Sequence, residues 1–270
     1  MSVQIHEQTM SEQILLNIQG VNKRFGGLQA LTDVGIRIMQ GQIYGLIGPN
    51  GAGKTTFFNV ITGLYQPDSG TFELAGKPYS PSAPHDVARA GIARTFQNIR
   101  LFKEMSVVEN LLVAQHMQCN RNLITGILNT PGYRRAEEKA LDTAFYWLEV
   151  VDLVDHANRL AGELSYGQQR RLEIARAMCT RPEIVCLDEP AAGLNPAETE
   201  ALAGMIRLLR DQHRITVVLI EHDMGMVMNI SDHIVVLDHG QVIARGLPAD
   251  IRNDPKVIAA YLGAEEEEVA

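Results

Sequence analysis

Residues 42–65, QIYGLIGPNGAGKTTFFNVITGLY, give the clearest indication of the fold. An apolar run of strand character leads into a glycine-rich loop, and a segment with helical spacing follows the loop. Residues 48–55 match the phosphate-loop pattern G-x-x-x-x-G-K-[ST], in which backbone N–H groups converge on phosphates. Strand, loop and helix in this order predict an α/β protein that binds a nucleoside triphosphate.

Two side chains of this loop carry most of the predicted chemistry. Lys54 supplies a point charge to the β- and γ-phosphates, and the Thr55 hydroxyl can bind Mg²⁺. The alternative, a glycine-rich turn with an exposed lysine, fits the flanking strand and helix poorly. The residues expected around the phosphates are Gly48, Pro49, Asn50, Gly51, Ala52, Gly53, Lys54, Thr55 and Thr56.

Two adjacent acids end the apolar run IVCLDEP, residues 184–190. Asp188 can hold Mg²⁺ directly or through water. Glu189, one residue later, is placed to polarise an attacking water as a general base. The alternative is that both acids only cap the turn at Pro190.

Polar residues also end two other predicted strands. His222 follows ITVVLIE, and its imidazole could reach the γ-phosphate, although a lone histidine is more often structural. Gln97 follows GIARTF, and its amide could contact phosphate, Mg²⁺ or water. The neighbouring Glu221 suggests no role.

A second anion-binding position is indicated by LSYGQQRRLEIARAM, residues 164–178. Ser165, Gly167 and Gln168 stand at the head of an amphipathic helix, where backbone N–H groups and the helix dipole favour an anion. This helix begins more than a hundred residues after the phosphate loop. The sequence therefore predicts a second phosphate contact, distinct from the first.

Composition excludes several classes of protein. The net charge of −8 over 270 residues argues against nonspecific nucleic-acid binding. No apolar run reaches the roughly 18 residues of a membrane span, and MSVQIHEQTMSEQ lacks the features of a signal peptide. Cys119, Cys179 and Cys186 lack metal-site spacing, which predicts reduced thiols. The closing EEEEV run predicts a frayed, solvated tail.

Strands alternating with helices predict an α/β core with a parallel sheet, whose ligands gather at the strand C-termini. Short strands are expected in LLNIQGV and VGIRI, and hairpins in GTFELAGKPY and in the pair HIVVLDHG and QVIARG. Residues 101–159 have helical periodicity, interrupted at 120–135 by a predicted loop or short broken helix. A helix is expected from about Pro196, and a short one ending near Tyr261.

The phosphate loop, Gln97, LSYGQ, LDEP and His222, in this order, resemble the nucleotide-binding subunit of ATP-binding cassette (ABC) transporters over residues 13–262. The resemblance implies a single P-loop NTPase (RecA-like) core with an antiparallel β subdomain and an inserted α-helical subdomain. The implied boundaries are 13–97 and 165–246 for the core, 98–164 for the helical subdomain, and 247–270 for a C-terminal helix and acidic tail.

The resemblance also implies that two cassettes pack head to tail. The signature residues Ser165, Tyr166, Gly167 and Gln168 would then contact the γ-phosphate held by the other cassette, with Tyr166 replacing the first glycine of LSGGQ. Phe25 matches the aromatic residue that stacks on adenine; otherwise it is an ordinary half-buried phenylalanine. ATP and Mg²⁺ are the implied cofactors, with Thr55, Gln97 and Asp188 at the metal and Glu189, His222 and Gln97 in catalysis.

Two further segments follow from the resemblance. RLFKEMSVVENL, residues 100–111, matches the surface that receives a coupling helix from the membrane subunit. AAGLN, residues 191–195, ends in Asn195 where many cassettes carry aspartate, so the communication between subunits is in question.

Within this family the chain resembles the LivG-type ATPases of high-affinity branched-chain amino acid importers. The segments that carry this resemblance include GIARTFQNIRLF, LNTPGYRRAEEKAL, DEPAAGLNP and IRNDPKVIAAYLG. It implies a peripheral subunit on the cytoplasmic face of the inner membrane. Its implied partners are a second ATPase, sister or identical, two permeases and, indirectly, a periplasmic binding protein, with no nucleic acid. The alternatives are the same motor with urea or lipopolysaccharide as cargo, a nontransport cassette, or a degenerate regulator.

Overall fold

A computed structural model describes residues 13–116 and 130–269 of the chain. Its larger sheet has six strands in the order β10-β9-β3-β8-β7-β6. All neighbouring pairs are parallel except β9 and β10, which form the predicted hairpin. The strands are β3 (Ile43–Ile47), β6 (Ile92–Arg94), β7 (Ile184–Asp188), β8 (Thr216–Ile220), β9 (His233–Asp238) and β10 (Gln241–Gly246). Strands β3, β7 and β8 are buried along their whole length, as central strands of a parallel sheet are.

A smaller antiparallel sheet has the order β2-β1-β4-β5. Its strands are β1 (Ile14–Phe25), β2 (Leu28–Met39), β4 (Ser69–Leu74) and β5 (Lys77–Tyr79). The first two are longer than the predicted strands, because β1 continues through bulges on both sides of Val21 and takes Gly20 at φ 64°. The hairpin predicted for GTFELAGKPY is β4 and β5.

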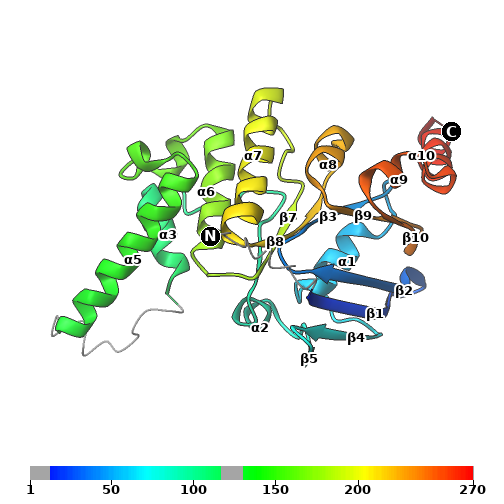
Figure 1. The fold of residues 1–270 in the computed structure, drawn as a ribbon, viewed down its shortest axis with the longest axis horizontal. Helices are drawn as coiled ribbons and strands as arrows, with labels where there is room; N and C mark the ends of the chain where they lie inside the picture. Colours follow the sequence, from blue (N-terminus) through cyan, green and yellow to red (C-terminus); the bar gives the residue numbers. More distant parts are fainter. Residues whose placement is uncertain (1–12, 117–129, 270) are drawn as a thin grey trace, which may run out of the picture.

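Helices cover both faces of the larger sheet (Figure 1). Helix α1 (Lys54–Ile61) packs between the two sheets, where Phe57 and Phe58 join one hydrophobic core. The opposite face carries a second core with helices that include α6 (Tyr166–Met178), α7 (Pro196–His213) and α8 (Met224–Ile230). The remaining short helix near the first core is α2 (Pro84–Arg89).

The described residues between β6 and β7 form helices and no named strand, as the sequence predicts. They comprise α3 (Val107–Ala114), α5 (Pro131–Val150), the 3₁₀ turns Val154–His156 and Ala161–Glu163, and α6. Of the two predictions for residues 120–135, the loop is wrong at the end of this stretch, because Thr130 caps α5 and Pro131 begins it. Its first part, like Cys119, lies outside the described residues.

The chain closes with α9 (Pro248–Arg252) and α10 (Pro255–Val269), at the opposite end of the molecule from α5 (Figure 1). The α10 backbone continues through the glutamate run, so the predicted helix end near Tyr261 and the frayed tail are both wrong. Glutamate is a strong helix former, which accounts for the extension. Among the described helices, none combines the length and the apolar character needed to cross a membrane.

Candidate functional site

The phosphate loop follows β3 directly and leads into α1. Gly48 has φ 148°, and a Cβ there would lie 2.0 Å from the Leu237 carbonyl oxygen. Gly53, the N-cap residue of α1, has φ 95°, and a Cβ there would lie 2.8 Å from the Ala30 carbonyl oxygen. Only glycine fits these two positions, so the spacing of the motif is set by backbone geometry.

Lys54 is 6% exposed and turns back over its own loop. Its Nζ donates to the carbonyl oxygens of Gly48 and Pro49 at 2.7 and 2.8 Å. Burial lowers the pKa of Lys54, and the charge of Glu189 opposes that shift. The ammonium and the carboxylate therefore face the same space.

That space is a cavity of about 440 Å³. It brings together residues from five places in the sequence: Phe25, Leu28, Gln29, Ala30, Asn50, Gly51, Ala52, Gly53, Lys54, Thr55, Thr56, Glu189, His222, His239 and Gly240. Phe25 is partly exposed, and its ring packs edge-on against Tyr65 with centroids 5.2 Å apart. A partly exposed aromatic ring and a glycine-rich loop that line one cavity suit a purine nucleotide.

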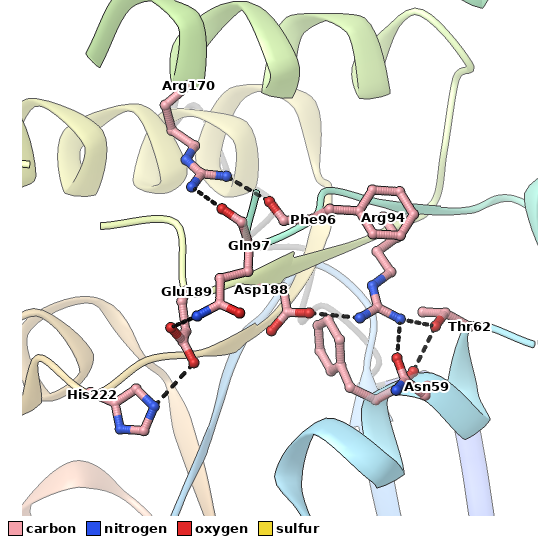
Figure 2. Close-up of polar contacts among 10 residues, drawn as sticks. Asn59, Thr62, Arg94, Phe96, Gln97, Arg170, Asp188, Glu189 and His222 are labelled. Atoms are coloured by element: carbon pink, nitrogen blue, oxygen red, sulfur yellow. Dashed lines mark hydrogen bonds and ion pairs between the residues drawn. The ribbon is translucent and has the colours of Figure 1, made fainter. Parts of the chain in front are cut away.

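Glu189 stands between two of the other predicted catalytic residues (Figure 2). Gln97 Nε2 donates to Glu189 Oε2 at 2.7 Å, and His222 Nε2 lies 3.1 Å from Glu189 Oε1. Gln97 and His222 do not end strands as predicted; each follows a strand that stops at Arg94 or Ile220. The extra residues carry both side chains past the sheet edge to Glu189.

Asp188 is held by a cation that the sequence analysis missed. Arg94 Nη2 donates to Asp188 Oδ2 at 2.6 Å, and Nη1 donates to Asn59 Oδ1 and Thr62 Oγ1 at 2.7 Å each (Figure 2). Both members of the pair are almost buried. A basic residue at the end of a strand next to the acidic one was the available indication. Arg94 thus connects α1, β6 and β7 below the cavity.

Glu221, which had no predicted role, holds the turn that follows Asp188. Its Oε1 accepts from the Ala191 N–H at 2.6 Å, and its Oε2 accepts from the His222 N–H at 3.1 Å. Burial raises the pKa of Glu221, and these N–H donors oppose the shift. The residue fixes the backbone on which Glu189 and His222 are carried.

The signature residues lie apart from this cavity, since none of them lines it. Ser165 caps α6 and forms a capping box with Gln168: Gln168 N–H donates to Ser165 Oγ at 3.3 Å, and Ser165 N–H donates to Gln168 Oε1 at 3.0 Å. A Cβ on Gly167 would lie 2.7 Å from Glu198 Oε1, so a larger residue there would displace the end of the Glu198 side chain. Ser165 and Tyr166 are exposed at the head of the helix.

The donor set near the phosphate loop fits Mg²⁺ better than a softer metal. Thr55 and Asp188 offer oxygen atoms, which Mg²⁺ prefers. In the described part of the chain, no three His, Cys, Asp or Glu side chains gather into a metal site of their own. A cation here would therefore depend on oxygens of the nucleotide for its remaining ligands.

Comparison with known protein families agrees with this geometry. A family model described as "ABC transporter" matches residues 31–192. The chain belongs to the ABC transporter family. A second model, described as "Branched-chain amino acid ATP-binding cassette transporter", matches residues 241–267 of this ABC protein.

Similar proteins span the same length as this ABC protein. The high-affinity branched-chain amino acid transport ATP-binding protein BraF of Pseudomonas aeruginosa is 55% identical, over 92% of this chain and 98% of its own. LivG of Escherichia coli strain K12, with the same description, is 54% identical over 93% and 98%. Among solved structures, the ADP conformation of MJ1267, an ATP-binding cassette of an ABC transporter, has a TM-score of 0.80 at 35% identity, covering 93% of this chain and 99% of that one.

Proposed function

We propose that this chain is the ATP-hydrolysing subunit that powers an ABC importer of leucine, isoleucine and valine. The observation that carries the enzymatic part is the position of Glu189, held by Gln97 and His222 at the cavity that contains the phosphate loop. The cargo rests on the names of BraF and LivG and on the second family model.

In this proposal each residue of the cavity has a separate task. Phe25 stacks on the adenine, the loop N–H groups bind the phosphates, and Lys54 exchanges its carbonyl partners for phosphate oxygens. Glu189 accepts a proton from the attacking water, and His222 holds Glu189 and reaches the γ-phosphate. Thr55 and Asp188, with the Gln97 amide oxygen, would hold Mg²⁺, which when bound neutralises charge on the β- and γ-phosphates.

The head of α6 is the second proposed phosphate contact. A hydroxyl has one hydrogen and two lone pairs, so Ser165 can cap its own helix through a lone pair and still donate to a phosphate. Because this helix head is exposed away from the chain's own cavity, we propose that it serves the nucleotide of a second cassette, sister or identical. Two permeases and a binding protein complete the proposed importer, with this subunit on the cytoplasmic face of the inner membrane.

An apolar groove of about 340 Å³ is the proposed contact with a permease. Phe102, 50% exposed, lines it together with Phe96, Leu64, Val113 and Arg176. Phe96, which lines the groove, directly precedes Gln97 in the sequence. A permease helix seated in the groove can therefore act on the contact between Gln97 and Glu189. Of the predicted surface, Phe102 lines this groove, whereas Met105 is half-buried and is not among its described lining residues.

The substitution Glu189→Gln tests the enzymatic part. It removes the base and leaves the side-chain volume almost unchanged, so ATP binding is retained while phosphate release falls about 10²- to 10⁴-fold. The matched control is Glu200→Gln, on the exposed part of α7, which keeps the wild-type rate. Phosphate release near the wild-type rate in Glu189→Gln contradicts the assignment of the base.

Uptake by cells tests the cargo. Cells that lack this subunit are complemented with the wild-type chain or with Glu189→Gln, and the entry of labelled leucine, isoleucine, valine and urea is followed. The wild-type chain alone restores entry of the three amino acids. Restoration of urea entry instead keeps the motor and overturns the proposed cargo.

A further inference from the structure

Arg170, in the first half of α6, carries a charge that is shielded completely from solvent. Its exposed fraction is 0%, and it is among the largest completely buried side chains of the described residues. A buried guanidinium is costly unless hydrogen bonds and an opposite charge compensate for it. Its partners therefore show what the residue is for.

Two of those partners are main-chain carbonyls outside α6. Nη1 donates to the Phe96 carbonyl oxygen at 2.8 Å, and Nη2 donates to the Gln97 carbonyl oxygen at 2.7 Å (Figure 2). The fork of one guanidinium thus fixes two consecutive peptide units at the residue whose side chain contacts Glu189. Glu173 Oε2, 2.9 Å from Nη1, supplies the opposite charge from the next turn of the same helix.

The fourth partner is the aromatic residue of the signature. Arg170 Nη2 donates to the Tyr166 hydroxyl at 3.3 Å. The Tyr166 ring lies against the AAGLN loop, because a Cβ on Gly193 would be 3.3 Å from Tyr166 Cε1. A glycine in place of Tyr166 could make neither contact, so the departure from LSGGQ adds a link between the helix head and both loops.

We propose that Arg170, oriented by Tyr166, is a positioning residue that holds Gln97 in contact with Glu189. Arg170 touches neither nucleotide nor Glu189; it acts through the peptide of Gln97, whose Nε2 lies 2.7 Å from the base. The link makes the head of α6, which faces the second cassette, and the base of the same chain one connected unit. This inference rests on the proposed function, because it requires Glu189 to be the base.

The test is a double-mutant cycle on ATP hydrolysis. Arg170→Lys keeps the charge beside Glu173 but cannot hold both carbonyls, so kcat falls about tenfold while the Kd of a nonhydrolysable ATP analogue is unchanged. In the Gln97→Ala background the same substitution has no further effect on kcat, because there is no Gln97 side chain left to position. Arg171→Lys is the matched control, because the guanidinium of Arg171 contacts the Val151 carbonyl and Asp152 and not the peptide of Gln97. This substitution leaves kcat unchanged in both backgrounds.

Tyr166→Phe keeps the test valid if Arg170→Lys unfolds. It removes only the hydroxyl of a side chain that is 44% exposed, and it lowers kcat less than Arg170→Lys, again only when Gln97 is present. The thermal unfolding midpoint of each variant separates lost positioning from lost structure.

Three outcomes overturn the inference. The first is an equal loss of kcat from Arg170→Lys with and without Gln97, since the residue then acts elsewhere. The second is an unchanged kcat in folded Arg170→Lys. The third, undiminished hydrolysis in Glu189→Gln, overturns the proposed function as well, and so is distinguished from a failure of the positioning alone.

Discussion

At the scale of single residues, Glu189, the proposed base, has an uncommon backbone conformation. Its φ is 45°, in the left-handed region that non-glycine residues seldom occupy. The Glu189 N–H donates to the Ile220 carbonyl oxygen at 2.9 Å, and the Ala192 N–H donates to the Glu189 carbonyl oxygen at 3.2 Å. These bonds hold a conformation that costs on the order of 1 kcal/mol, as is common at functional sites.

Phe25→Ala is expected to weaken nucleotide binding without altering chemistry. Phe25 presents its ring to the cavity and is supported on one side by Tyr65. Loss of stacking lowers the affinity for ATP by on the order of 1 kcal/mol, and Phe25→Tyr restores it. The measurement is ATP titration by calorimetry; an unchanged affinity in Phe25→Ala makes Phe25 an ordinary surface residue.

The residues that could be predicted from sequence are those whose meaning is local. Lys54 stands within one motif, and Glu189 directly follows an acid at a strand end, so pattern alone indicated that both belong to the cavity that they line. Three other residues could not be assigned a role, because each contacts a partner far away in the sequence. Arg94 is 94 positions from Asp188, Arg170 is 73 positions from Gln97, and Glu221 is 30 positions from Ala191. Only the packed sheet and α6 bring those pairs together.

At the scale of elements, Asn195 has a clear structural role. Glu198 N–H donates to Asn195 Oδ1 at 3.0 Å, and Asn195 N–H donates to Glu198 Oε2 at 3.0 Å, which forms a capping box on α7. Asn195→Ala is expected to cost about 1 kcal/mol in the free energy of unfolding, while Asn195→Asp is neutral, since both side chains cap well. Urea unfolding measures both, and equal stability of the alanine variant would contradict the cap.

Phe102→Glu is expected to separate hydrolysis from transport. A carboxylate in the apolar groove opposes the seating of a permease helix but lies outside the nucleotide cavity. ATPase activity of the isolated subunit is retained, and uptake in cells is abolished. Leu141→Glu, an exposed apolar position on α5, is the control that keeps uptake; survival of uptake in Phe102→Glu places the coupling surface elsewhere.

Element type was easier to predict than element ends. Apolar runs indicated β3, β7 and β8 because central parallel strands are buried on both faces. The start of α5 was missed because Thr130, Pro131 and Gly132 suggested a loop, although threonine followed by proline also begins helices. The full length of β1 was missed because register shifts after Val21, in the polar stretch up to Phe25, interrupt the alternation on which a strand prediction relies.

At the scale of the whole molecule, the chain has two helix heads that are predicted to bind phosphate and that do not share a cavity. The head of α1 faces the chain's own cavity, and the head of α6 is exposed away from it. The proposed second cassette explains this separation, since each complete site would take one head from each chain. The domain boundaries at 98 and 164 remain predictions of the same scheme.

Mixing two inactive variants tests that scheme in a chain that self-associates in ATP. Lys54→Ala cannot hold ATP, and Ser165→Arg blocks the head of α6 with bulk and charge. Their heterodimer contains one site with both defects and one intact site, so activity rises above both parents as the ratio approaches one to one. Crosslinking is used to show that the mixture contains a heterodimer that holds ATP. If the activity of such a mixture stays at the parental level, the composite site does not work independently, which contradicts the scheme.

The contacts of Lys54 also bear on the rate of product release. Release of the nucleoside diphosphate product would ordinarily leave a nearly buried ammonium without a partner. The desolvation cost of that unpaired charge would slow product release. Here the carbonyl oxygens of Gly48 and Pro49 can take the charge as the product leaves. On the proposed function, we therefore expect product release to proceed without leaving the Lys54 ammonium buried and uncompensated.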